Sequence, residues 1–250
     1  LEPVPVLQHR GQEAAGIGVG DGDRLVVFKD MGLVSNIFDE SILNSLHGSV
    51  GVGHTRYSTA GGKEWSNVQP MFNTTSNGVD IALCHNGNLV NYQELRDEAV
   101  ALGLYRENEK SLSDSMIMTA LLAHGVGEGN SVFGAAKQLL PSIKGAFCLT
   151  FTDGKTLYAA RDPHGVRPLV IGRLAQGWVV ASETCALDIV GAQFIREVEP
   201  GELISVNEAG IHSEKFAEPK RQGCVFEYVY LARPDTVIKG RNVHATRVNI

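Results

Sequence analysis

The stretch from Val79 to Gly103, VDIALCHNGNLVNYQELRDEAVALG, contains the change of structure that decides the fold. Its first part, Val79–Asn86, is a short and mostly apolar run, which is typical of a buried strand. From Leu89 onward, apolar residues recur at roughly helical spacing until a glycine ends the run. We therefore predict a strand followed by a helix, with the polar residues His85–Asn88 forming a turn between them.

The sequence on both sides of this stretch groups strands with strands and helices with helices. Two apolar runs on either side of Asp-Gly-Asp predict a hairpin over 16–29. Helical patterns cover 111–125 and 131–143, and the first is predicted to begin with a capping box, Ser111 to Asp114. Strand-like runs over 145–216 predict a β-meander. This grouping indicates a layered α+β fold rather than alternating βαβ units.

The composition excludes several classes of protein. A net charge of −6 and a pI of about 5.8 are unfavourable for a general nucleic-acid binder. No apolar run approaches the roughly 18 residues of a membrane span, and no secretory signal is recognisable. The four cysteines contain no Cys-x-x-Cys pair and are not spaced as a disulfide framework. These features predict a cytoplasmic protein that binds neither nucleic acid nor membrane.

The pair Asn86-Gly87 is the first candidate for chemistry. The Asn86 amide and the Gly87 backbone N–H could together form an oxyanion hole, in which two donors point at one developing negative oxygen. Asn-Gly is also a favoured turn pair, so a purely structural role remains an alternative.

Arg56 and Asp114 extend this candidate site. Arg56, at a strand end, can bind a carboxylate through two hydrogen bonds, or form a surface salt bridge. Asp114 can bind an ammonium group, or simply favour the N-terminus of its helix. With an oxyanion hole, these groups would recognise glutamine. A nucleophile is not evident, because Cys84 is expected to face a different layer and His9 has no hydroxyl or thiol beside it.

A further group of motifs identifies a resemblance. LQHRGQEAAGI, GLVSNIFDE, GVGHTRYSTAG, HNGNLVN, SDS, RDPHGVRPLVIG, ASETCALD and PGELISV occur here in the order found in glutamine phosphoribosylpyrophosphate amidotransferases. Asp162 and His164 belong to one of these motifs. They could bind a metal ion, but no third ligand is near, and the prolines and glycine around them predict a tight turn between two strands. The stretch over 224–243, CVFEYVYLARPDTVIKGRNV, resembles the start of the family's phosphoribosyltransferase domain. It disfavours asparagine synthetase, glutamate synthase and glucosamine-phosphate synthase.

The resemblance implies a fold, a domain division and roles for individual residues. The fold is the four-layer αββα sandwich of the N-terminal-nucleophile hydrolases, which is α+β. Residues 1–219 correspond to the glutaminase domain and 220–250 to the start of the phosphoribosyltransferase domain, with the polar stretch 217–224 as linker. The implied roles are substrate carboxylate binding by Arg56, ammonium binding by Asp114, an oxyanion hole of Asn86 and Gly87, and substrate support by Thr59 in a closing loop over 57–66.

The family's reaction is the hydrolysis of glutamine and the internal transfer of ammonia to phosphoribosylpyrophosphate. The product is 5-phosphoribosylamine, in the first step of de novo purine (IMP) synthesis. The resemblance implies glutamine and phosphoribosylpyrophosphate as substrates, a homo-oligomer and Mg²⁺ for the full-length enzyme, and no cofactor in this fragment. Some members carry a 4Fe–4S cluster, and Cys224 matches one ligand position. Members without the cluster can also have cysteine there, so both alternatives stay open.

The sequence departs from the family at its beginning. The family's nucleophile is an N-terminal cysteine whose own α-amino group is the general base, whereas position 1 here is Leu1. We therefore expect a chain truncated at both ends, lacking its first strand and nucleophile, and inactive by itself. The alternatives are a non-catalytic glutamine-binding or interaction domain and another class II amidotransferase.

Overall fold

A large antiparallel sheet forms the centre of the molecule. The computed structural model describes residues 3–22, 24–57, 64–109 and 111–250. The six strands of this sheet have the order β12-β11-β7-β6-β5-β4. Their bounds are β4 (Met71–Thr74), β5 (Asp80–Leu89), β6 (Gly145–Thr152), β7 (Leu157–Arg161), β11 (Glu202–Asn207) and β12 (Gly210–Lys215).

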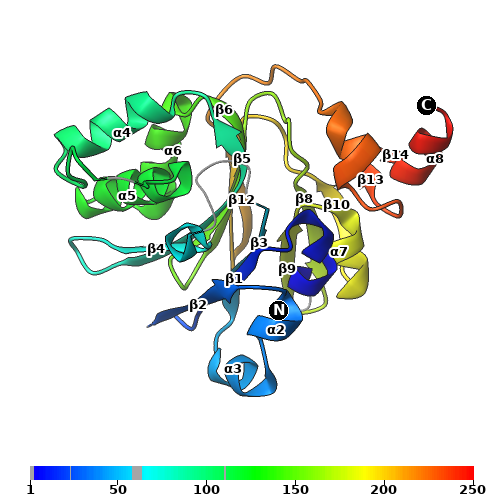
Figure 1. The fold of residues 1–250 in the computed structure, drawn as a ribbon, viewed down its shortest axis with the longest axis horizontal. Coiled ribbons are helices and arrows are strands. Elements are labelled where there is room, and N and C mark those ends of the chain that lie inside the picture. The colour runs from blue at the N-terminus through cyan, green and yellow to red at the C-terminus, as the bar shows by residue number, and fades with distance from the viewer. Residues whose placement is uncertain (1–2, 23, 58–63, 110) are drawn as a thin grey trace.

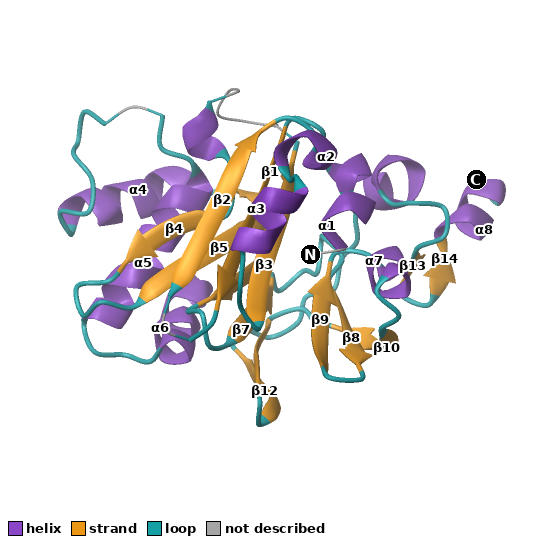
Figure 2. Cartoon of the chain, turned by 90° about the horizontal axis from the view of Figure 1, so that it is seen from below, coloured by secondary structure: helices purple, strands orange, loops and turns teal. Residues whose placement is uncertain are grey.

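Two three-stranded sheets form a second β layer (Figure 2). One has the order β2-β1-β3, with β1 (Ala14–Gly20), β2 (Leu25–Met31) and β3 (Val50–Arg56). The other has the order β10-β8-β9, with β8 (Val170–Leu174), β9 (Gly177–Ala181) and β10 (Gln193–Glu197). Apolar side chains fill the space between the layers: Val52 packs with Ala82 and Cys84, and Ile171 packs with Ile204.

Helices cover the two outer faces. The helices α4 (Tyr92–Ala101), α5 (Asp114–Gly127) and α6 (Val132–Leu139) lie together on the large sheet (Figure 1). The opposite outer layer contains α1 (Pro3–Val6), α2 (Val34–Ile37), α3 (Glu40–Ser45) and α7 (Thr184–Ile189). Short 3₁₀ turns are η1 (Gln8–Arg10), η2 (Trp65–Asn67) and η3 (Leu140–Ser142). The layers are therefore α, β, β and α, and the predicted α+β sandwich is confirmed.

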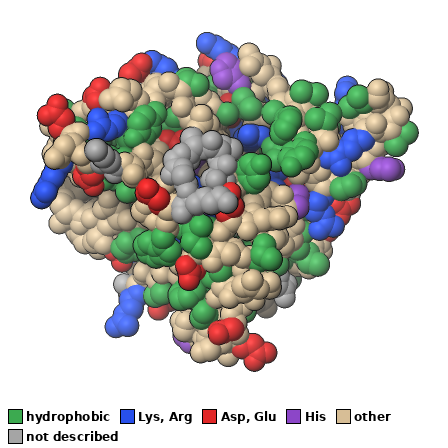
Figure 3. All heavy atoms as spheres, viewed as in Figure 1, with side chains coloured by type: hydrophobic (Ala, Val, Ile, Leu, Met, Phe, Trp, Pro, Cys, Tyr) green, Lys and Arg blue, Asp and Glu red, His purple; other side chains and the backbone are tan. Residues whose placement is uncertain are grey.

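The predicted linker is irregular, and a small unit follows it. Residues 216–224 form neither helix nor strand. The following elements are η4 (Glu227–Leu231), β13 (Val237–Ile238), β14 (Arg241–Asn242) and α8 (Val243–Val248). Residues of η4, β13 and α8 belong to one small apolar cluster. In the space-filling view, hydrophobic side chains gather at the upper right, over η4 (Figure 3). The domain division at 219/220 stays a prediction.

Three expectations from the sequence are wrong in detail. Strand β5 continues to Leu89, so the predicted turn at His85–Asn88 does not exist. The strands over 145–216 do not form a meander. β8, β9 and β10 follow β7 in the sequence but form a separate sheet, and β11 then pairs with β7. The N-cap of α5 is Ser113, whose Oγ accepts a hydrogen bond from the Met116 N–H, and not Ser111.

Candidate functional site

Gly87 lies inside β5, opposite Phe147 of β6. Its φ of 154° is one that L side chains rarely adopt, and a Cβ there would lie 1.9 Å from the carbonyl oxygen of Ala146. Only glycine permits this close approach of the two strands. Strand packing therefore requires glycine at position 87, and no turn is present there.

The Asn86 side chain carries an unused donor. Its Nδ2 atom is buried and, within the described part of the chain, has no hydrogen-bond partner. A buried donor without a partner is costly and rare, so such groups in native proteins call for an explanation. An amide N–H available to a ligand is what an oxyanion hole requires.

Cys84 lies on the same face of β5 as Asn86, since alternate residues of a strand share a face. The expectation that Cys84 faces a different layer is wrong, because the strand continues through Asn86 instead of ending there. Burial raises the pKa of Cys84 to about 12, although Thr150 and Lys29 act in the opposite direction. Cys84 is therefore a neutral thiol near pH 7 and a poor nucleophile.

Three of the four cysteines are expected to be unreactive in the folded protein. Burial raises the pKa of Cys148 to about 12 and that of Cys185 to about 11, while Cys224 is only partly buried. A chromogenic disulfide reagent should therefore modify one thiol rapidly, and all four only after unfolding in denaturant. Cys224→Ser should abolish the rapid phase. A rapid phase that survives this substitution would show that the buried thiols are accessible.

Arg56 is the last residue of β3 and is only 6% exposed, so its ion pair lies below the surface, and both alternatives for its role stay open. Its Nη1 atom lies 3.7 Å from Glu13 Oε2, and its carbonyl accepts a hydrogen bond of 3.2 Å from the Glu13 N–H. Gly11 packs so closely that a Cβ there would lie 2.4 Å from the Arg56 carbonyl carbon. The amino-terminal segment thus fixes Arg56 from two sides.

Asp114 is the first residue of α5, and its Oδ1 atom accepts a hydrogen bond of 2.7 Å from the Ser115 N–H. Burial acts to raise the pKa of Asp114. His85 and the backbone N–H groups of Ser115 and Leu89 outweigh this effect and hold the pKa below its ordinary value. Asp114 is therefore a carboxylate near neutral pH, as binding of an ammonium group requires.

His54 of β3 is partly buried and lies close to His85 of β5. Burial, together with electrostatic interaction with His85 and Arg56, lowers the pKa of His54 to about 4, so its ring is neutral near pH 7. On the other side of His85, Nδ1 lies 3.6 Å from Asp114 Oδ1. The structure thus places Arg56, Asn86-Gly87 and Asp114 on three adjacent elements.

The structure says less about the other residues that the sequence analysis singled out. Thr59 lies outside the described residues, as does most of the predicted closing loop. Asp162 accepts backbone hydrogen bonds from Phe147, His164 and Val166, consistent with the predicted turn. Within the described ranges, no group of three or more His, Cys, Asp and Glu side chains is placed to hold a metal ion. Iron–sulfur ligation by Cys224 stays a prediction for a longer chain.

Sequence reasoning missed a buried ionic cluster around Arg10, which we call the Arg10 cluster. Arg10 lies 2.6 Å from Glu183 Oε1 and 2.9 Å from Glu227 Oε1, and both carboxylate side chains are at most 2% exposed. His9 Nε2 also contacts Glu183, at 2.8 Å, and Arg167 contacts Glu227, at 2.9 Å. The cluster joins the amino-terminal segment to η4. The unusual polarity of LQHRGQ was its signal in the sequence.

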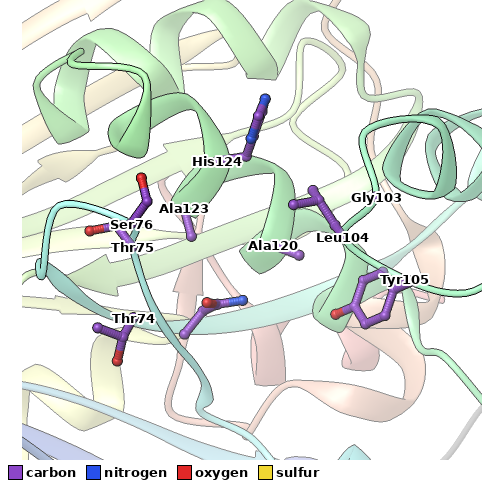
Figure 4. Close-up of a pocket in the computed structure, with 10 residues that line it drawn as sticks. Thr74, Thr75, Ser76, Gly103, Leu104, Tyr105, Ala120, Ala123 and His124 are labelled. Carbon is purple, nitrogen blue, oxygen red and sulfur yellow. The ribbon is translucent and has the colours of Figure 1, made fainter.

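Two clefts of the molecule lie elsewhere. One, of about 360 Å³, lies between the segments over 73–76 and 103–105 and helix α5 (Figure 4). The other, of about 610 Å³, is lined by parts of the segments 141–145, 163–166 and 217–220. Neither is lined by Arg56, Asn86 or Asp114. The candidate site is therefore defined by its polar groups and not by either of these cavities.

The fold and this site define the class of protein. Residues 54–188 match the family described as "Glutamine amidotransferase domain", and the chain belongs to that family. Within the class, its sequence is similar to amidophosphoribosyltransferases. It is 58% identical over 246 residues to the one from Mycobacterium tuberculosis strain H37Rv, and 41% identical over 247 residues to the one from Bacillus subtilis strain 168. These alignments cover 98% of this chain and 46% and 50% of the relatives.

Solved structures agree with this assignment. The B. subtilis glutamine phosphoribosylpyrophosphate amidotransferase complexed with ADP and GMP matches with a TM-score of 0.89 and 38% identity, over 99% of this chain and 53% of the other. A structure described as the allosteric regulatory enzyme of purine biosynthesis matches with a TM-score of 0.92 and 40% identity, over 99% and 52%. The chain therefore spans about half the length of these relatives. In the described part, no helix is long and apolar enough to cross a membrane.

Proposed function

We propose that these residues are the glutamine-hydrolysing part of an amidophosphoribosyltransferase, which transfers the released ammonia to phosphoribosylpyrophosphate in the first step of purine synthesis. The observation that carries the proposal is the meeting of three elements. The end of β3 supplies a guanidinium, β5 supplies a free amide donor beside a glycine, and α5 supplies a carboxylate. These groups complement the carboxylate, amide and ammonium of glutamine. The names of the similar relatives support the same reaction.

The residues of the site have separate roles in the proposed hydrolysis. Arg56 binds the substrate carboxylate, Asp114 binds the ammonium, and Thr59 supports the bound substrate. A nucleophile adds to the amide carbon, and the oxygen that becomes negative is stabilised by Asn86 Nδ2 and the Gly87 N–H. Collapse of this intermediate releases ammonia and leaves an acyl-enzyme that water hydrolyses to glutamate.

The nucleophile in this proposal is the amino-terminal cysteine of the family, activated by its own α-amino group. An α-amine titrates near pH ~7.7–8.0 and suits this role. The three buried cysteines of the chain are protonated thiols at neutral pH and do not replace it. We further propose that residues 1–219 form the glutaminase domain and 220–250 begin the transferase domain. Mg²⁺, a possible cluster ligand at Cys224, a cytoplasmic location and a homo-oligomer belong to the proposal for the longer enzyme.

The 250-residue chain is expected to release no glutamate from glutamine, because no thiolate is available at the oxyanion hole. Placing a relative's leading segment, processed to begin with Cys-Gly, before Leu1 should restore hydrolysis. The same segment beginning with Ser-Gly is the matched control and should remain far less active. Glutamate release can be measured with a coupled dehydrogenase assay. Activity of the original chain that disappears in Asn86→Ala would refute the expectation, as would a folded extended chain without activity.

A non-catalytic glutamine-binding domain is the second candidate. It is favoured by the combination of a retained polar site with thiols that are chemically inert. Calorimetric titration with glutamine separates the two candidates. Saturable binding without hydrolysis, even after the Cys-Gly segment is restored, would support the second one.

A further inference from the structure

His85 precedes Asn86 on β5, and the proposed reaction assigns it no role. Its side chain is 2% exposed and projects from β5 toward the helix layer, where Nδ1 lies 3.3 Å from Ser115 Oγ and 3.6 Å from Asp114 Oδ1. Asn86 lies on the opposite face of β5. The strand therefore directs the Asn86 amide, the proposed hydrogen-bond donor to the oxyanion, toward the space between the sheets, and the His85 imidazole toward the helix layer.

The position of His85 is fixed by its neighbours. Its backbone N–H donates a hydrogen bond of 2.6 Å to Gln69 Oε1, and Gln69 Nε2 donates one of 3.1 Å to Ser115 Oγ. Gln69, His85 and Ser115 are each at most 8% exposed. These contacts close a ring of three buried side chains that joins β5 to the first turn of α5. A closed polar network of this kind holds its members in one arrangement.

The two ring nitrogens of His85 have different surroundings. Nδ1 faces Ser115 and Asp114, whereas Nε2 is buried and lacks a hydrogen-bond partner in the described ranges. A Cβ at Gly87 would lie 2.8 Å from Nε2, so the ring also occupies the space below Gly87. The proton is best assigned to Nδ1, because an N–H there faces a hydroxyl and a carboxylate.

We propose that His85 is a positioning residue, which orients the Asp114 carboxylate toward the α-ammonium group of the substrate. Its Nδ1–H donates to Ser115 Oγ at 3.3 Å, and the Ser115 hydroxyl donates to Asp114 Oδ1 at 3.3 Å. This inference rests on the proposed function, because it assigns Asp114 to that ammonium group. Asp114 is held at its backbone side by the Ser115 N–H, at 2.7 Å, and His85 restrains it from the strand side. The carboxylate is then oriented before substrate binds, which reduces the entropy lost on binding.

Steady-state glutaminase kinetics of the natural gene product that contains these residues can test the proposal. The substrates are glutamine and glutaramate, which is glutamine without its α-amino group. The most informative variants are His85→Asn and His85→Gln. An Asn amide can donate from near the position of Nδ1, whereas a Gln amide reaches the position of Nε2. Asp114→Asn and the double variant His85→Gln/Asp114→Asn complete the set, and His124→Leu, elsewhere on α5, is the matched control.

The expected result is a rise of about tenfold in KM for glutamine in His85→Gln, equivalent to about 1.4 kcal/mol, with little change in kcat. His85→Asn should retain most of the wild-type KM. Neither variant should alter kinetics on glutaramate, and His85→Gln should have no further effect when Asp114 is already Asn.

Other outcomes would overturn the proposal in distinguishable ways. Equal losses on both substrates, or equal effects of Asn and Gln at position 85, would assign His85 a general structural role. If Asp114→Asn itself left KM for glutamine unchanged, the ammonium-binding role in the proposed function would fail first. An effect of Asp114→Asn without an effect of His85→Gln would remove only the present inference.

Discussion

Asn86→Ala is expected to lower kcat for glutamine hydrolysis by about 10²–10³-fold, with a much smaller change in KM. The substitution removes the buried Nδ2 donor while leaving the β5 backbone and the Gly87 N–H in place. The donor acts on negative charge that exists only after the nucleophile has added, so its loss affects the transition state more than substrate binding. The measurement is glutamate release by the natural gene product that contains these residues.

The matched control for this prediction is Asn88→Ala. Asn88 lies on the same strand and the same face as Asn86, but its side chain is exposed. The control should therefore leave kcat within about twofold of wild type, since exposed side chains away from reacting atoms contribute little. Equal losses in the two variants would indicate a general disturbance of β5, and a normal kcat in Asn86→Ala would exclude Asn86 from the oxyanion hole.

Arg10→Leu is expected to reduce the free energy of unfolding by about 3–5 kcal/mol. The substitution leaves the Glu183 and Glu227 carboxylates, at most 2% exposed, without their shared cation. Of the basic residues in the cluster, Glu183 would keep only His9 and Glu227 only Arg167. A buried charge that is incompletely paired is costly because water does not solvate it. Urea unfolding of the 250-residue chain, followed by circular dichroism, measures the change. Proteolysis within η4 should also accelerate, because Glu227 loses one of its two anchoring arginines.

Arg233→Ala provides the comparison for Arg10→Leu. The Arg233 side chain pairs with Asp235 at 2.8 Å, but both groups are more than 40% exposed. Its removal should cost no more than about 1 kcal/mol, as for most surface ion pairs. Similar losses in the two variants would show that the Arg10 cluster is not held more tightly than a surface pair.

Acidification should weaken the same cluster. Burial acts to raise the pKa of Glu183, but His9, Arg10 and Thr236 outweigh it and lower the pKa from an ordinary value of 4.5 to about 2. A carboxyl whose pKa is lower in the folded state stabilises the protein fully above its ordinary pKa. That stabilisation is lost as the pH falls from about 4.5 toward 2. The difference in stability between wild type and Arg10→Leu should therefore narrow over this range.

The elements predicted correctly are those whose signals are local. The hairpin of β1 and β2 follows from a short polar turn between two apolar runs, and α5 follows from a long apolar run after serine and aspartate. The continuation of β5 past Asn86 was not predictable in this way, because Asn-Gly favours a turn when considered alone. Pairing with β6 overrides that preference.

The errors arise where distant segments determine the structure. β7 pairs with β11, although β8, β9, α7 and β10 lie between them in the sequence. Arg10 meets Glu183 and Glu227 across separations of 173 and 217 residues. The identities of Arg56, Asn86, Gly87 and Asp114 came from motifs, and their mutual placement came from the fold. The positioning role of His85 could not be predicted from the sequence, because it depends on the contact of β5 with α5.

The two faces of β5 have a consequence for insertions and deletions. Because successive side chains alternate, one residue added or removed between Asp80 and Cys84 would shift the register and exchange the directions of His85 and Asn86. The imidazole would then point between the sheets and the amide toward α5. Lineages that carry this site should therefore keep the length of this half of the strand unchanged, even where one buried apolar residue replaces another.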